Sequence, residues 1–151
     1  MNKKLVAVVV GALVFYVVQF AIGMAMGPLI HDGALADEYD ATSEFWRPEL
    51  NQEPPDMGAL MPRWIATGLI IALVFAAFYV WIRGGLKGVG WLKGLKFGFA
   101  MALVMIAYMW GWSGVFNLPA KIWLWWSVET PIYMIPAGAV LGWVAGKLAP
   151  E

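Results

Sequence analysis

Four long stretches of the chain are almost free of charge, and they constrain its fold more than any other feature. They cover residues 5–27, 64–82, 97–120 and 122–146, and Glu129 is the one charged residue within them. Each is close to the roughly 20 residues that a helix needs to cross a hydrocarbon core of roughly 30 Å. We therefore predict an all-α integral membrane protein, a four-transmembrane-helix bundle. It forms a single membrane domain over residues 1–151, with helices at about 5–27, 63–83, 92–116 and 119–147.

The composition excludes the main alternatives to this fold. Apolar residues make up 62% of the chain and charged residues 13%, which is not the balance of a soluble domain. A transmembrane barrel would show short segments of alternating polarity instead of continuous apolar runs. The first apolar run is longer than the roughly 7 to 15 residues of a signal sequence core, so we expect this helix to be retained. Cysteine is absent, which excludes disulfides and thiolate chemistry.

The distribution of charge predicts an orientation. Eight of the ten acidic residues lie between Asp32 and Asp56, in a long connection at 28–62. Basic residues in short loops stay on the cytoplasmic side of a membrane. We expect both termini to be cytoplasmic, the acidic loop between helices 1 and 2 to be extracytoplasmic, and the membrane to be the bacterial cytoplasmic (inner) membrane. Seven basic residues fall on the predicted cytoplasmic side: Lys3, Lys4, Arg83, Lys87, Lys93, Lys96 and Lys147.

Two rows of glycine at four-residue spacing predict close helix packing. Small residues one turn apart let two backbones approach each other in lipid. On a regular helix Gly138 lies on the face opposite Glu129, so the last helix has two faces that need protein neighbours. We infer, as a hypothesis, that this helix also contacts another subunit. The helix-packing rows are Gly90, Gly94 and Gly98, and Gly138, Gly142 and Gly146.

Glu129 is the most informative single residue of the apolar runs. A carboxylate inside a membrane is costly unless it is protonated, paired or hydrogen-bonded. Counting a helical rise of about 1.5 Å per residue from the middle of each run places four polar residues at a similar depth. We predict that they form one intramembrane polar layer: Gln19, Thr67, Tyr108 and Glu129. Either Glu129 is a structural glutamate that ties this layer together, or the layer surrounds a small polar cavity.

Two prolines follow Glu129 in the same run. Pro131 and Pro136 lack a backbone N–H and crowd the preceding turn, so each deprives a carbonyl four residues earlier of its helical partner. We predict kinks at both positions. Freed carbonyls beside a carboxylate can line a cavity, as they do in the broken helices of transporters.

The acidic connection contains aromatic residues that a plain linker would not need. We predict a short helix within residues 33–44, which ends before Trp46-Arg47-Pro48 because a residue that precedes proline avoids the helical region. The acidic residues do not follow the spacing of a calcium loop, and we predict no metal site. We expect the connection to pack on the mouth of the bundle through Tyr39, Phe45, Trp46 and Arg47.

Several short motifs resemble an uncharacterised family of small bacterial four-span membrane proteins. They are the run YDATSEFWRP at 39–48, with its WRP in the outer loop, the run GLKFG at 94–98, and Trp126 followed by Val128 and Glu129. The resemblance covers most of the chain. It implies the four-span fold and no particular activity.

The sequence contains no recognised catalytic constellation. Its one histidine, His31, could be an axial ligand of a haem or chlorophyll, or could be hydrogen-bonded to the loop; no cofactor is otherwise predicted. We expect a non-enzymatic accessory or structural subunit of a larger membrane assembly. Its partners would be membrane lipids and either other membrane subunits or further copies of this chain, and not nucleic acid. The alternatives are a small transporter or hydrophobic-ligand-binding bundle with its site at Glu129, and, less favoured, a membrane enzyme acting on lipid or quinone.

Overall fold

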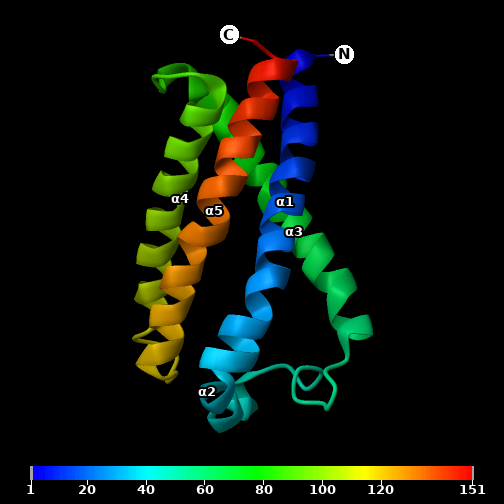
Figure 1. The fold of residues 1–151 in the computed structure, drawn as a ribbon, viewed down its shortest axis with the longest axis vertical. Helices are drawn as coiled ribbons and strands as arrows, with labels where there is room; N and C mark the ends of the chain where they lie inside the picture. Colours follow the sequence, from blue (N-terminus) through cyan, green and yellow to red (C-terminus); the bar gives the residue numbers. More distant parts are fainter. Residues whose placement is uncertain (1, 151) are drawn as a thin grey trace.

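The computed structural model describes residues 2–150, and within that range it contains helices and loops but no strand. Four of its helices are long and apolar enough to cross a membrane. The all-helical fold with four candidate spans is therefore confirmed. These helices are α1 (Lys3–Leu29), α3 (Met57–Ile82), α4 (Gly90–Trp112) and α5 (Ala120–Leu148) (Figure 1).

Two helix boundaries differ from the predicted ones. α3 begins at Met57 instead of near residue 63, because the Asp56 carboxylate caps it by accepting a hydrogen bond from the Ala59 backbone N–H at 3.1 Å. α4 ends at Trp112 instead of near residue 116, where the Val115 N–H turns back to the Trp112 carbonyl at 2.9 Å. Hydropathy does not depend on helix caps or turns, so it does not locate the start of α3 or the end of α4.

The two ends of the bundle differ in charge. α1 begins and α5 ends at the same end, which we call the terminal end (Figure 1). The turn between α3 and α4, with the 3-10 segment Arg83–Gly85, lies there too. The opposite end, which we call the loop end, holds the acidic residues at 32–56 and the connection at 113–119. All seven basic residues that the sequence assigned to one side belong to elements at the terminal end.

The glycine rows of α4 and α5 face each other within the chain. A Cβ added to Gly94 would lie 2.0 Å from the Gly138 carbonyl oxygen, and one added to Gly138 would lie 2.5 Å from the Gly94 carbonyl oxygen. Gly142 meets Gly90 in the same way, with a Cβ-to-oxygen distance of 2.3 Å. No side chain fits between the two backbones, so these positions require glycine for steric reasons.

The other side of α5 packs against α1. Gln19 donates a hydrogen bond to the Met134 sulfur at 2.9 Å, and a Cβ on Gly11 would lie 2.6 Å from Leu141 Cδ1. α5 is thus the central helix, with α4 on one side and α1 on another (Figure 1). The two packed faces of α5 therefore do not by themselves require another subunit, contrary to the reasoning from the sequence.

α3 touches the bundle over only part of its length. Near its middle Gly68 lies against the Tyr16 ring, where an added Cβ would come within 2.5 Å of the ring, and Ala72 and Ala76 are buried. Residues 62–67 are all exposed, and α3 diverges from α1 toward the loop end (Figure 1). Small residues permit the contact with α1, and in the first turns of α3 Leu60 is the buried side chain.

The acidic connection is a folded cover on the loop end. α1 passes into a π-helical turn (Ile30–Ala34), followed by α2 (Ala36–Ala41) and a 3-10 turn (Ser43–Phe45), and Trp46 is extended with ψ of 162°. The expected short helix at 33–44 is thus three short helical pieces, and it ends at the expected place. Ile30 and Leu35 are buried together with Ile122 of α5, so the cover packs on the start of the last helix.

Candidate functional site

Glu129 is buried on α5, roughly 14 Å along the helix from Ala120 at the usual rise of about 1.5 Å per residue. Its exposed fraction is 9%. Among the described residues, His31 is the basic side chain within 4 Å of it, with Nε2 at 3.4 Å from Glu129 Oε1. The π-helical turn that follows α1 carries His31, and so the first span supplies the partner of the carboxylate in the last.

A chain of hydrogen bonds holds His31 in place. Its Nδ1 lies 2.8 Å from the Tyr39 hydroxyl, and the Trp126 indole N–H donates to the same hydroxyl at 2.9 Å. Burial raises the pKa of Tyr39, so this phenol keeps its proton. Tyr39 can accept from Trp126 and donate to His31 Nδ1, an arrangement that leaves the Nε2 hydrogen of the imidazole for Glu129.

The predicted polar layer does not form as one layer. Gln19 bonds to Met134, and Thr67 is exposed and donates to the Arg63 carbonyl of its own helix at 2.9 Å. The divergence of α3 keeps Thr67 away from α5. Counting residues along each helix gives the depth of a side chain but not the tilt of its helix, so the prediction could not include this divergence. Tyr108 of α4 and Glu129 do come together, since both line the same cavity.

This cavity has a volume of about 710 Å³ and lies between α4, α5 and the cover. Eight of its thirteen lining residues are aromatic and one, Glu129, is charged. We call it the aromatic cavity. Tyr108, which is 69% exposed, and the exposed Phe45 mark its open side. The lining residues are Phe45, Trp46, Met105, Tyr108, Met109, Trp112, Phe116, Leu118, Trp123, Trp126, Glu129, Thr130 and Tyr133.

One polar group in the wall lacks a partner among the described residues. Trp123 is 4% exposed, and its indole Nε1 is buried without a hydrogen-bond acceptor. Its ring stands edge-on to Trp126, with centroids 5.5 Å apart. A buried indole N–H normally finds an acceptor, and so the wall has an unmet donor.

α5 runs through both prolines without interruption. Pro131 supplies no N–H to the Ser127 carbonyl, and the neighbouring hydroxyls bond to carbonyls one turn earlier, Ser127 to Trp123 and Thr130 to Trp126, each at 2.7 Å. Tyr133 in turn lies 3.5 Å from the Thr130 hydroxyl. The helix is therefore not broken as transporter helices are, although Thr130 beside Pro131 does line the aromatic cavity.

Of the four aromatic and basic residues expected to pack the cover on the bundle, only some do so. Tyr39 and Trp46 pack against the start of α5, with Trp46 edge-on to Trp126 at 6.2 Å. Phe45 is half-exposed and lines the cavity. Arg47 does not pack on the bundle; it forms an exposed ion pair with Glu49 at 2.7 Å.

Sequence reasoning missed the tryptophans that build the site. Tryptophans near the ends of spans usually form an interfacial aromatic belt, yet Trp112, Trp123 and Trp126 all line the aromatic cavity. The density of tryptophan at the start of the last span, three within four residues, was the available signal. A belt and a cavity wall give the same signal in one sequence, because only the helix rotation distinguishes them.

The position of His31 bears on the cofactor hypothesis. Its two ring nitrogens face Tyr39 and Glu129, so an axial role would require the loss of one of these contacts. No group of three His, Cys, Asp or Glu side chains suited to a metal occurs within residues 2–150. Lys121, the other basic group near this end of α5, pairs with Glu38 at 2.7 Å.

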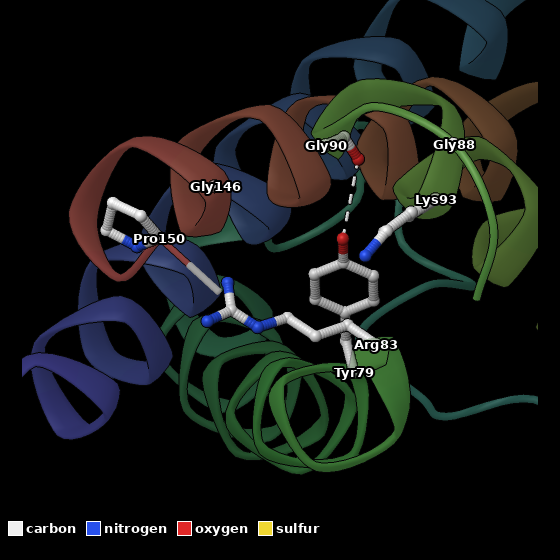
Figure 2. Close-up of a pocket in the computed structure, with 7 residues that line it drawn as sticks. All are labelled: Tyr79, Arg83, Gly88, Gly90, Lys93, Gly146 and Pro150. Atoms are coloured by element: carbon white, nitrogen blue, oxygen red, sulfur yellow. Dashed lines mark hydrogen bonds between the residues drawn. The ribbon is translucent and has the colours of Figure 1, made fainter. Parts of the chain in front are cut away.

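A second, smaller cavity of about 210 Å³ lies at the terminal end. Arg83, 5% exposed, donates to the carbonyls of Ala145 at 2.8 Å and of Ala149. Figure 2 shows its guanidinium directed toward the end of α5, and the Tyr79 hydroxyl bonded to the Gly90 carbonyl at 3.4 Å. The Ala145 carbonyl also accepts from the Ala149 backbone N–H at 3.0 Å, so Arg83 adds a second donor there and supplies one to Ala149 just beyond the helix. Its charge is favourable at the negative end of the helix dipole.

The resemblance to small bacterial four-span proteins stays a prediction. In comparisons with protein-family models, curated proteins and solved structures, none matches the chain, and the geometry of the aromatic cavity therefore carries the functional argument.

Proposed function

We propose that this protein is a membrane bundle that binds a hydrophobic small molecule in the aromatic cavity beside Glu129. The observation that carries the proposal is a largely apolar cavity of about 710 Å³ with one buried carboxylate in its wall. Ligand sites have volumes of roughly 300 to 1,000 Å³ and combine apolar walls with a few polar groups that orient the ligand. Glu129 and the Thr130–Tyr133 pair are such groups, and they lie on one wall.

The unmet donor of Trp123 supports the same proposal. Leaving a buried N–H without an acceptor costs about 1–3 kcal/mol, and an acceptor atom on a ligand would recover part of that cost. The role proposed is binding and not catalysis. The polar wall presents one carboxylate with one histidine behind it, and aromatic rings make up most of the remainder.

Native mass spectrometry of the full chain tests this proposal. The chain is purified from bacterial membranes in a mild detergent, and the retained non-protein mass is measured. Met109→Trp would fill the cavity, and Ala107→Trp, on the exposed side of the same helix, is the matched control. We expect a discrete small-molecule adduct on the wild type and on Ala107→Trp, and its loss from Met109→Trp. Equal adducts on all three proteins, or none on any, would contradict the proposal.

A second candidate function is an accessory subunit of a larger membrane assembly. Gly23 and Gly27 of α1 have no neighbour within 4 Å of an added Cβ, on the half of α1 from which α3 has diverged. A helix of another protein could approach the α1 backbone there. We expect Gly27→Leu to release a partner that copurifies from native membranes, while Gly111→Leu, at an equally open glycine of α4, retains it. Recovery of the chain alone from native membranes would end this candidate.

We further propose that the terminal end is cytoplasmic, that the cover is extracytoplasmic, and that the membrane is the bacterial inner membrane. The gathering of seven basic residues at the terminal end supports this orientation. The chain has no cysteine, so single cysteines can report it. In intact spheroplasts, an impermeant maleimide should label Gln52→Cys of the cover and spare Gly84→Cys at the terminal end, both exposed positions. The reverse pattern would invert the orientation.

A further inference from the structure

The wall of the aromatic cavity has a definite electrostatic character. The faces of tryptophan, tyrosine and phenylalanine rings carry negative partial charge, and eight such residues line the cavity. The one formally charged lining group, Glu129, is acidic, and no lysine or arginine lines the cavity. The polar hydroxyls of Tyr108, Thr130 and Tyr133 can accept as well as donate hydrogen bonds.

The basic groups around the cavity are neutralised by other partners. On α5, Lys121 pairs with Glu38 at 2.7 Å, and in the cover Arg47 pairs with Glu49 at 2.7 Å. His31, from the turn after α1, is the one basic group beside Glu129, and it acts as a cation only when protonated. A neutral imidazole can donate its Nε2 hydrogen to Glu129, but it adds no positive charge to the wall of the cavity.

We infer that the ligand of the aromatic cavity is an organic cation that carries apolar groups; the inference rests on the proposed binding function. The cation lies against the aromatic rings with its charge toward Glu129, and its apolar groups contact the tryptophans and methionines of α4 and α5. Aromatic rings with an acidic group attract quaternary or substituted ammonium ions, whereas an anion would face repulsion from both. Such a cation can be a free lipophilic ion or the ammonium headgroup of a lipid.

Three probes of similar shape and different charge test which sign of ligand charge the cavity prefers. Tetraphenylphosphonium is a cation, tetraphenylborate an anion, and tetraphenylsilane is neutral. Their binding to the full chain is measured by equilibrium dialysis in detergent, with protein-free micelles subtracted. We expect saturable binding of tetraphenylphosphonium, at least about tenfold tighter than that of either other probe, because opposite charges a few ångströms apart attract strongly away from water.

The Glu129→Gln variant isolates the charge, because it keeps the shape of the side chain. We expect it to weaken tetraphenylphosphonium binding by about tenfold or more and to leave the binding of tetraphenylsilane unchanged. Glu44→Gln removes an exposed acid outside the cavity and should keep wild-type affinity for the cation. Thermal unfolding of each variant identifies any loss of fold. Should Glu129→Gln unfold, Trp112→Leu tests the same site by removing one aromatic face. This variant too should weaken the binding of the cation selectively.

The outcomes separate this inference from the function on which it rests. If all three probes bind equally well and Met109→Trp excludes them, the cavity binds hydrophobic molecules but the inferred cation is wrong. If no probe is excluded by Met109→Trp, the proposed function itself fails. Selective binding of the anion would also overturn the inference.

A competition measurement distinguishes the two sources of the cation. Bound tetraphenylphosphonium is challenged with mixed micelles of phosphatidylethanolamine or, as a matched lipid without an ammonium group, phosphatidylglycerol. Displacement by phosphatidylethanolamine alone identifies a lipid headgroup as the ligand. Displacement by neither lipid identifies a free lipophilic cation. Equal displacement by both shows that the acyl chains and not the ammonium group compete, which contradicts the inference.

Discussion

His31 Nε2 lies 3.4 Å from Glu129 Oε1, and this contact joins the end of the first span to the buried carboxylate of the last. The contact depends on the fold of the cover. Tyr39 holds the imidazole from its far side, and Trp126 of α5 holds Tyr39. Residues of three separate elements, the turn after α1, α2 and α5, therefore position the polar group in the wall of the aromatic cavity.

The hydroxyl of Tyr39 allows a test of how the cover is held to α5. It serves both His31 and Trp126, at 2.8 and 2.9 Å. We expect Tyr39→Phe to lower the free energy of unfolding by about 1–3 kcal/mol, because it leaves a half-buried indole N–H without its acceptor. Denaturation followed by tryptophan fluorescence measures this. Tyr108→Phe removes an exposed hydroxyl and should cost much less; an equal cost would contradict the arrangement.

The contact between α4 and α5 predicts a steep steric penalty. An added Cβ at Gly94 would lie 2.0 Å from the Gly138 carbonyl oxygen, so the helices must separate to admit it. We expect Gly94→Ala to destabilise the bundle by about 1–3 kcal/mol or more, as overpacking does. Gly111→Ala, in the same helix with open space around it, should be neutral or slightly stabilising because alanine favours helix. Thermal unfolding in detergent compares the two, and similar stability of both variants would refute the close approach.

The ion pair between Glu38 and Lys121 predicts a pH dependence at the loop end. The hydrogen bond from Lys121 holds the pKa of Glu38 below its ordinary value of 4.5. The fold therefore favours the carboxylate, so the stabilisation is fully present above pH 4.5 and is lost as the pH falls through the lower folded pKa.

Accordingly, Glu38→Gln should be less stable than the wild type near neutral pH, and the difference should disappear in strong acid. Glu44→Gln, at an exposed acid of the same segment, should show no such pH-dependent difference. Unfolding is measured for the three proteins across the acid range. A difference that grew on acidification would have the wrong sign.

The hydrogen bonds of Arg83 predict that the terminal end of the bundle requires a guanidinium. It bonds to two carbonyls of α5, those of Ala145 and Ala149, from a buried position. We expect Arg83→Lys to lower the free energy of unfolding by about 1–3 kcal/mol, because a single ammonium does not reproduce the forked geometry of arginine. Lys147→Ala removes an exposed charge from the same end and should change stability little. Full stability of Arg83→Lys would contradict the proposed capping.

The sequence by itself determined the four apolar helices, the separation of acidic from basic residues, the glycine rows and the isolation of Glu129. These follow from composition and from spacing along a helix, which are local properties of the chain. Only the tertiary structure decided which faces meet. It set the glycine rows against each other within one chain, placed His31 rather than Gln19 or Thr67 beside Glu129, and turned Trp112, Trp123 and Trp126 into the wall of a cavity. Packing between distant segments sets the tilt and rotation of each helix and the position of the cover. The hydropathy of a run and the depth of a residue along one helix do not depend on that packing, so they do not predict these features.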